Sequence, residues 1–245
     1  MGAAVLRRSA PLSSLNGERE FRINIAIDGP AGAGKSTVAR KVAKALSYVY
    51  VDTGAMYRAV TWDMLNLGIE AENEQEVLAR MESLEIELIP GEDGQRVRLS
   101  GQDVTDDIRS LAVTRTVSRY AQIEGLRAEL SSAQRQMALR KGVVMDGRDI
   151  GTTVLPDAEV KIFMTATVEE RARRRFRELP ESGESITLEQ LEREIADRDE
   201  LDRNREVSPL VCAEDATVLD TTRMTIEEVS DAIVRLAERQ LTRQG

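Results

Sequence analysis

The chain contains no histidine and a single cysteine, Cys212, among its 245 residues. The absence of histidine excludes Ser-His and Cys-His nucleophilic catalysis, histidine general bases and histidine metal ligands. One cysteine cannot form an intramolecular disulfide or a zinc site built on cysteine pairs, which favours a reducing, cytoplasmic compartment. Any chemistry must therefore use carboxylates, lysine, arginine and the backbone.

Basic residues, aromatic residues and long apolar runs are also scarce. The 34 lysines and arginines are outnumbered by 43 acidic residues, giving a net charge of −9, which disfavours binding to a nucleic-acid polymer. No apolar run approaches the roughly 18 residues that would cross a bilayer, so we expect no membrane partner. With 3% aromatic and 41% hydrophobic residues, the composition is typical of a helix-rich globular protein.

Short β-branched and apolar runs alternate with helical patterns along most of the chain. The five predicted strands are residues 23–28, 48–52, 142–146, 160–164 and 217–220. Helical periodicity separates most of them, as in residues 38–46 and 226–236. This alternation predicts an α/β fold in which a five-stranded parallel sheet is covered by helices on both faces.

Two segments depart from this alternation. Residues 84–105 alternate with period two around a Pro-Gly-Glu-Asp-Gly turn, which predicts a small antiparallel insert. Residues 171–209, the predicted lid, are rich in charge and carry a break at residues 180–185 between two polar helices; we expect a mobile flap. Residues 1–21 are predicted to be a disordered tail, so that residues 22–245 form one domain.

A glycine-rich phosphate-binding loop (P-loop) follows the first predicted strand. The pattern Gly-x-x-x-x-Gly-Lys-Ser spans residues 29–36 and opens a helix, which is the context that distinguishes such a loop from a chance glycine turn. Glycines let backbone N–H groups curl around a phosphate, Lys35 can reach the terminal phosphates, and the Ser36 hydroxyl can bind Mg²⁺. The predicted ATP-binding residues are Gly29, Pro30, Ala31, Gly32, Ala33, Gly34, Lys35, Ser36 and Thr37.

Charged residues follow the next two strands. Arg58 comes after the second strand and Arg148 after the third. Arginines converging on a P-loop can bind a second phosphate and stabilise charge as a phosphoryl group moves, although each alone could be a solvated strand-end charge. Asp146 closes the third strand, where it could help to hold Mg²⁺ or, alternatively, cap a helix.

The second half of the lid carries a regular charge pattern. Arg198, Asp202 and Arg205 recur at i, i+4 and i+7, which predicts one face of a helix. A closing lid could present this face to a nucleotide. A solvated helix face is the alternative interpretation.

Four segments together resemble bacterial-type cytidylate kinases, which are nucleoside monophosphate kinases. They are DGPAGAGK at 28–35, DTGAMYR at 52–58, DGRDIGT at 146–152 and RDELDRNR at 198–205. The resemblance covers about residues 22–242, and the insert looks like the enlarged monophosphate-binding region of that family. It implies the P-loop nucleoside monophosphate kinase fold and transfer of the γ-phosphoryl group of MgATP to CMP or dCMP, giving CDP or dCDP and ADP.

The resemblance also implies roles for individual residues. The acceptor phosphate would be bound by Arg58 and Arg148, with Thr53 and Tyr57 in the same pocket. Cytosine would be read by a hydroxyl, a guanidinium and a carboxylate, those of Ser118, Arg127 and Asp149.

The remaining implied roles concern the sugar, the transferred group and the metal. Asp202 and Arg198 would hold the sugar side, and Arg205 would approach the moving phosphoryl group. Catalysis is thus expected from Lys35, Arg148, Arg198 and Arg205, with Ser36 and Asp146 at the metal. Such an in-line transfer needs positioning and charge stabilisation but no histidine base.

Three other functions compete with this interpretation. The first is a kinase of the same fold that acts on AMP, UMP or a non-nucleotide acceptor. The second is a GTPase-like switch, which would be expected to carry an Asn-Lys-x-Asp motif, but the chain contains no Asn-Lys pair. The third is an ATPase acting on nucleic acid, which conflicts with the net charge. We expect a monomer, because no apolar face beyond the core is evident.

Overall fold

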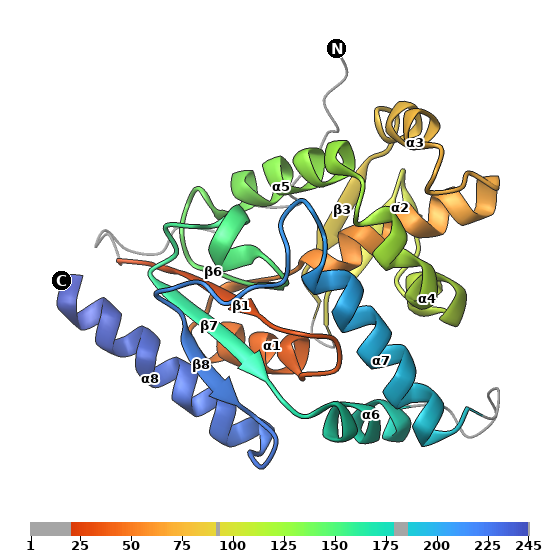
Figure 1. Cartoon of the computed structure of the whole chain (residues 1–245). Coiled ribbons are helices and arrows are strands. Elements are labelled where there is room, and N and C mark those ends of the chain that lie inside the picture. Colours follow the sequence, from red (N-terminus) through yellow and green to blue (C-terminus); the bar gives the residue numbers. More distant parts are fainter. Residues whose placement is uncertain (1–20, 92–93, 179–185, 245) are drawn as a thin grey trace.

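A parallel five-stranded β-sheet forms the centre of the computed structural model, which describes residues 21–91, 94–178 and 186–244 (Figure 1). Its strands are β1 (Asn24–Asp28), β2 (Val49–Asp52), β6 (Val143–Gly147), β7 (Val160–Thr165) and β8 (Thr217–Asp220). They lie in the order β2-β6-β1-β7-β8, and every neighbouring pair is parallel. All five predicted strands are confirmed, and β1, which leads into the P-loop, lies in the middle of the sheet.

The helices and the small sheet occupy the segments between these strands. The helices are α1 (Lys35–Ala45), α2 (Thr53–Leu67), α3 (Glu74–Met81), α4 (Leu111–Tyr120), α5 (Glu124–Ala138), α6 (Val168–Arg177), α7 (Leu188–Arg203) and α8 (Ile226–Gln244). Two short helical segments are η1 (Asp107–Arg109) and η2 (Ile150–Val154). The insert consists of β3 (Ile86–Ile89), β4 (Arg96–Leu99) and β5 (Gln102–Asp103).

The two faces of the parallel sheet are covered by different helices, as predicted. Alternate residues of a strand point to opposite faces, so Ile25 and Ile27 of β1 pack in a core with α1 and α8. Ala26 packs on the other face with η2 and α5. Figure 1 shows α1 and α8 on one side of the sheet and α5 on the other. The P-loop is therefore built on a strand that is buried from both sides.

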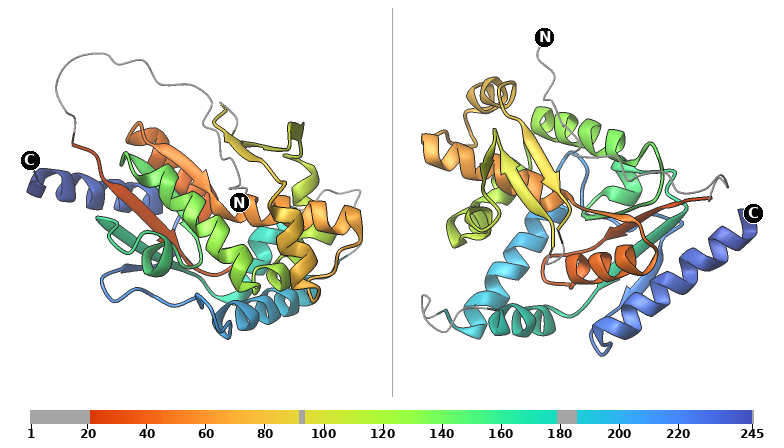
Figure 2. Two further views of the ribbon diagram at one scale, coloured as in Figure 1. Left: turned by 90° about the horizontal axis from the view of Figure 1, so that it is seen from above. Right: turned by 180° about the vertical axis from the view of Figure 1, so that it is seen from behind.

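The insert is a three-stranded antiparallel sheet, in agreement with the sequence pattern. Along β4, Val97 and Leu99 are buried while Arg96 and Arg98 are exposed. The buried pair packs in one core with α2 and α5. Seen from behind, the yellow strands of the insert lie above α1 (Figure 2). The insert is thus attached to α2, the helix that begins at the end of β2.

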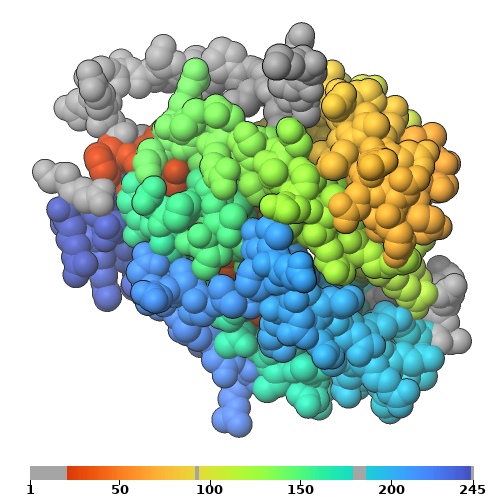
Figure 3. Space-filling model, turned by 45° about the horizontal axis from the view of Figure 1, so that its top comes forward, coloured from red at the N-terminus to blue at the C-terminus, as the bar shows by residue number. Residues whose placement is uncertain are grey.

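The segment predicted to form the lid contains most of helix α6 and the whole of α7 in the part of the chain that the structure describes. Ala172, Leu191 and Ile195 form a small apolar core between them, and an ion pair of 3.0 Å between Arg115 and Glu194 joins α4 to α7. In Figure 3 the light-blue surface of α7 lies against the green surface of α4 and α5. The predicted break at residues 180–185 and all but the last residue of the predicted tail lie outside the described residues.

One detail of the lid prediction is wrong. Helix α7 ends at Arg203, and Asn204 caps it, so Arg205 does not share a helix face with Arg198 and Asp202. The chain turns after the helix and brings Arg205 back, so that its Nη1 atom lies 3.9 Å from Asp202 Oδ1.

None of the helices in residues 21–91, 94–178 and 186–244 is long and apolar enough to cross a membrane.

Candidate active site

The P-loop is held tightly between β1, β7 and α1. Gly29 has a φ of 145°, and a Cβ atom there would lie 2.0 Å from Met164 O, so only glycine fits. Gly34, with a φ of 85°, precedes α1 and leaves its first N–H groups facing the loop. Lys35 Nζ donates a hydrogen bond to Pro30 O at 2.7 Å, inside the curve of the loop. This arrangement is the one in which a phosphate meets backbone N–H groups and a lysine together.

The ammonium group of Lys35 is buried. Burial lowers the pKa of Lys35 to about 7, and the charge of Arg148 acts in the same direction. An anion bound in the loop would oppose both effects and favour the charged lysine. Lys35 is therefore poised to gain charge when a phosphate binds.

Asp146, at the end of β6, is the centre of a buried hydrogen-bond network. Its carboxylate accepts from Ser36 Oγ at 2.8 Å and from Tyr50 OH at 2.9 Å, and its main-chain oxygen accepts from Thr53 Oγ1 at 2.7 Å. Burial raises the pKa of Asp146 to about 6, and the charge of Asp52 adds to this effect. Asp146 is thus not a helix cap; Asp52 is, because its Oδ1 atom accepts from Ala55 N at 2.8 Å.

The donors around Asp146 suit a magnesium ion. Ser36 and Asp146 supply a hydroxyl and a carboxylate oxygen beside the P-loop, and Mg²⁺ in kinases is held by one or two such oxygens together with water and substrate phosphates. Within the described residues, no group of three or more acidic, histidine or cysteine side chains is arranged to hold a metal by itself. These residues therefore fit a metal that arrives with a nucleotide.

Arg58 is held at the end of β2 by Asp52. Its Nη2 atom lies 3.0 Å from Asp52 Oδ2, and Gly54 leaves space for the guanidinium, since a Cβ there would lie 2.9 Å from Arg58 Nη1. The pairing with Asp52 was not foreseen from the sequence, because a spacing of six residues does not place two side chains on one helix face.

Arg127 and Asp149 form a fully buried ion pair of 2.6 Å. The Arg127 guanidinium also donates to Ala121 O, at the C-terminal end of α4, and its Cζ atom lies 5.4 Å from the centre of the Tyr57 ring. Ser118 is buried on the same last turn of α4. The three residues predicted to read a base therefore come from α4, α5 and the end of β6, around one point.

Asp28, at the end of β1, positions this corner and was not predicted. Its two carboxylate oxygens accept hydrogen bonds from Ile150 N at 2.8 Å and Gly151 N at 2.7 Å. Burial raises the pKa of Asp28 to about 6 in spite of these bonds. Because η2 follows Asp149 directly, Asp28 fixes the backbone that carries the Arg127–Asp149 pair.

The end of α7 is joined to the end of β6 by charged contacts. Arg148 Nε donates to Asp202 Oδ2 at 2.8 Å, and Leu210 N donates to Asp202 O at 2.8 Å, so the chain after the lid folds back onto the same residue. Cys212, two residues further, is exposed. Burial lowers the pKa of Arg198 to about 10, and the positive charge of Arg148 contributes. This corner therefore concentrates positive charge.

Several of these buried arginines have N–H groups without a hydrogen-bond partner in the described residues. The atoms are Nε of Arg58, Arg127, Arg198 and Arg205, and Nη2 of Arg205. A buried charged donor without a partner is costly unless a ligand satisfies it. The pattern therefore indicates a site for an anion, or for more than one.

Two further arginines connect the predicted lid to the P-loop. From the sequence, no specific role was predicted for them beyond the high charge of that segment. Arg171 donates to Ala31 O at 2.9 Å and to Asp199 Oδ2 at 2.6 Å. Arg174 donates to Ala33 O at 3.4 Å and to Thr221 O at 2.6 Å. Their spacing of three residues on α6 was the available signal, because it places both on one helix face.

The family model and the curated relatives that match this chain carry the same name. The family model described as "Cytidylate kinase" matches residues 25–239. A cytidylate kinase of Bacillus cytotoxicus is 56% identical over 220 residues, which cover 90% of this chain and 98% of that protein. One of Oceanobacillus iheyensis is 54% identical over 215 residues, covering 88% and 94%. Among solved structures, a shikimate kinase from Acinetobacter baumannii in complex with shikimate is 18% identical with a TM-score of 0.44, covering 90% of this chain and 95% of that one.

Proposed function

Because the chain belongs to the cytidylate kinase family, we propose that it transfers the γ-phosphoryl group of ATP to CMP or dCMP and releases ADP. The observation that supports this most directly is the group of buried arginines with unpartnered N–H atoms beside the P-loop. A P-loop accounts for the phosphates of one nucleotide. Arginines at the ends of the neighbouring strands account for a second phosphate.

The reaction is an in-line displacement at phosphorus. An oxygen of the CMP phosphate forms the new P–O bond while the bond from the γ-phosphorus to the ADP oxygen breaks, and the electron pair leaves with ADP. Arg58 and Arg148 bind the acceptor phosphate, with Thr53 lining the pocket, and Lys35 binds the terminal phosphates of ATP. The main contribution of these residues is to hold two anions together and to neutralise their charge.

Mg²⁺ would be held beside the P-loop by Ser36 and Asp146, and Tyr50 orients the carboxylate. The ion supplies neutralisation of the phosphate charge when it is bound. The short contact between Ser36 and Asp146 places both oxygens at the same side of the loop.

Base selection rests on Ser118, Arg127 and Asp149. A carboxylate accepts a hydrogen bond from the exocyclic amine of cytosine, whereas uracil presents a carbonyl oxygen at that position. A guanidinium donates to the ring acceptors, and the ring of Tyr57 lies beside it. CMP should therefore be preferred over UMP. Asp202 is assigned to the sugar side of the acceptor.

The lid completes the site over the two nucleotides. We assign residues 22–245 to one kinase domain, residues 84–105 to its monophosphate-binding insert and residues 171–209 to the lid. Closure excludes water, which would otherwise accept the phosphoryl group. The unpartnered N–H groups of Arg205 are assigned to the transferred phosphoryl group, and that of Arg198 to the sugar side.

A coupled assay of ADP release tests this proposal. The purified chain is incubated with MgATP and CMP, dCMP, UMP, AMP, GMP or shikimate in turn, with a reaction lacking acceptor as the control. Fast ADP release with CMP and dCMP alone is the expected result. Release with another acceptor would retain the kinase fold and overturn the base assignment, and release without acceptor would indicate an ATPase.

A further inference from the structure

Gln95 connects the insert to the end of strand β2. It lies directly before β4, and its Oε1 atom accepts a hydrogen bond from Asp52 N at 2.9 Å. The preceding Gly94 lies against α1, since a Cβ atom there would be 3.2 Å from Arg40 Nη1. The insert therefore contacts the parallel sheet near the P-loop, in addition to packing on α2.

The amide nitrogen of Gln95 has no hydrogen-bond partner within the described part of the chain, although it is buried. The orientation of the amide is fixed, because a flip would place the NH₂ group against the N–H group of Asp52. A buried donor that is held in place without a partner is costly unless a ligand satisfies it. This atom is therefore a candidate ligand contact.

Gln95 lies on the acceptor side of the site. The residue that it contacts, Asp52, also binds Arg58 through its carboxylate at 3.0 Å, and Arg58 Nε is a second unpartnered buried donor. Asp52 thus contacts two residues that each have an unpartnered buried donor. Its backbone N–H binds Gln95, and its carboxylate binds Arg58. Gln95 Nε2 and Arg58 Nε can donate to the same anion, because neither of these two atoms is the one that contacts Asp52.

We propose that Gln95 belongs to the acceptor site and that its Nε2 atom donates a hydrogen bond to a phosphate oxygen of the bound nucleoside monophosphate. This inference rests on the proposed function and adds to it a contact from the insert. It also gives the insert a direct part in sensing the phosphate: Oε1 binds the end of β2 while Nε2 binds the substrate.

The variant Gln95→Glu tests the donor. It keeps the shape and the acceptor for Asp52 N, but replaces the NH₂ group with an oxygen. The Kd for CMP, measured by titration calorimetry, should rise roughly 10-fold or more. The Kd for cytidine, which lacks the phosphate, and the KM for ATP should change less than about 2-fold. The matched control is Gln102→Glu, the same change at an exposed position of β5, which should leave all three values unaltered.

The variant Gln95→Met removes the donor without adding a charge; it also removes the acceptor of Asp52 N, which Gln95→Glu retains. It should weaken CMP binding by about 3- to 10-fold without affecting cytidine. Equal weakening of CMP and cytidine in both variants, or no weakening of CMP, would overturn the inference. A wild-type chain that binds CMP but does not phosphorylate it would instead contradict the proposed function, and the ratio of the two Kd values would still decide the role of Gln95.

Discussion

The two ends of the lid use buried arginines in opposite ways. At its base on α6, Arg171 donates from Nε, Nη1 and Nη2 to Ala166 O, Ala31 O and Asp199. Beyond the end of α7, Arg205 is also buried, but its Nε and Nη2 atoms have no partner in the described residues. Burial and charge are alike in the two cases. The completeness of the hydrogen bonding is what distinguishes an arginine that holds the fold from one that binds an anion.

The sharpest test of this contrast is Arg205→Ala, which should have the largest effect. If Arg205 stabilises the transferred phosphoryl group, kcat should fall by about 10³-fold or more, with a much smaller change in the Kd for CMP. Thermal unfolding should be nearly unchanged, because the replaced guanidinium is incompletely bonded. Stopped-flow or steady-state kinetics measure the first effect.

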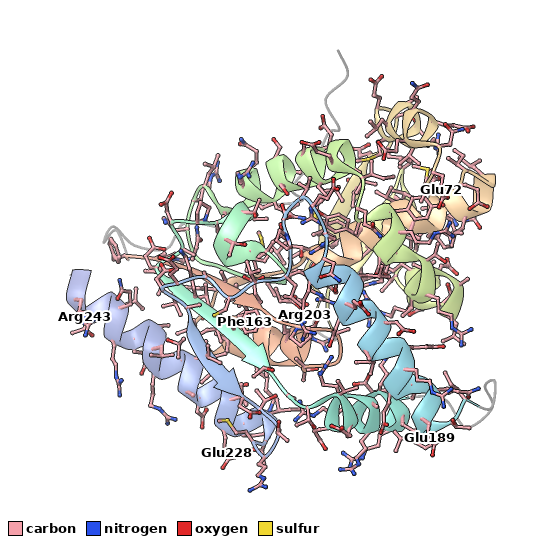
Figure 4. The ribbon with its side chains drawn as sticks, in the orientation of Figure 1. Glu72, Phe163, Glu189, Arg203, Glu228 and Arg243 are labelled. Atoms are coloured by element: carbon pink, nitrogen blue, oxygen red, sulfur yellow. The ribbon has the colours of Figure 1, made fainter. Side chains whose placement is uncertain are left out.

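Arg203→Ala is the matched control, since Arg203, which is labelled in Figure 4, is exposed at the end of α7 and its contact with Asp199 is 3.9 Å long. Its kcat should stay near that of the wild type. An Arg205 variant in which only KM rises would contradict the role assigned to it.

The opposite result is expected at the base of the lid. Arg171→Ala removes the 2.6 Å ion pair of the buried Asp199 carboxylate and leaves it the 3.9 Å contact with the exposed Arg203, so the free energy of unfolding should fall by about 3 to 5 kcal/mol in urea denaturation. The double variant Arg171→Ala with Asp199→Ala should lose less than the sum of the two single changes, because no charge is left unpaired. The exposed Arg173 on the same helix is the control position. If Arg171→Ala lost activity but kept its free energy of unfolding, the structural role of Arg171 would be contradicted.

Asp28 is a buried carboxylate whose two oxygens both accept hydrogen bonds. Its replacement should have a smaller effect on the free energy of unfolding, and this effect should depend on pH. Burial raises the pKa of Asp28 in the folded protein to about 6, from an ordinary value of 3.8, so the folded protein binds more protons than the unfolded one between these pH values. Its contribution to stability is therefore largest at low pH and decreases by about 3 kcal/mol as the pH rises through this interval.

Asp28→Asn should remove this component from the pH profile of the unfolding free energy. The difference between wild type and variant, measured from pH 4 to pH 7, should decrease as the pH rises. Asp157→Asn, at an exposed position, should leave the profile unchanged. A difference for Asp28 that is constant with pH would show that its folded pKa is not raised.

The sheet could be predicted well because its signals are local. Each strand is a short, largely apolar run, and parallel order follows from the intervening helices. The end of α7 was predicted less well. Arg205 continues the charge period of the helix, but Asn204 ends the helix before it, and capping by a single residue is weak in the sequence.

Residues of the site could be predicted only where they belong to a recognisable sequence motif. Lys35, Arg58 and Arg148 stand in recognisable segments, whereas Asp28 and Gln95 act through contacts across 122 and 43 residues. Nothing near Gln95 in the sequence indicates its partner, because the contact depends on how the insert docks on α2. The roles of the predicted site residues stay predictions until the variants are measured.

The exposed Cys212 gives this molecule a ready attachment point for a spectroscopic probe. It is the one cysteine in the chain, and Trp62 is the one tryptophan. Trp62 lies on α2 and packs against the core shared with the insert, whereas Cys212 follows the segment that folds back onto Asp202. A dye coupled to the thiol and the indole therefore form an energy-transfer pair between α2 and the segment that follows α7. Changes in the distance between α2 and the segment that follows the predicted lid can thus be followed by fluorescence in the unaltered sequence.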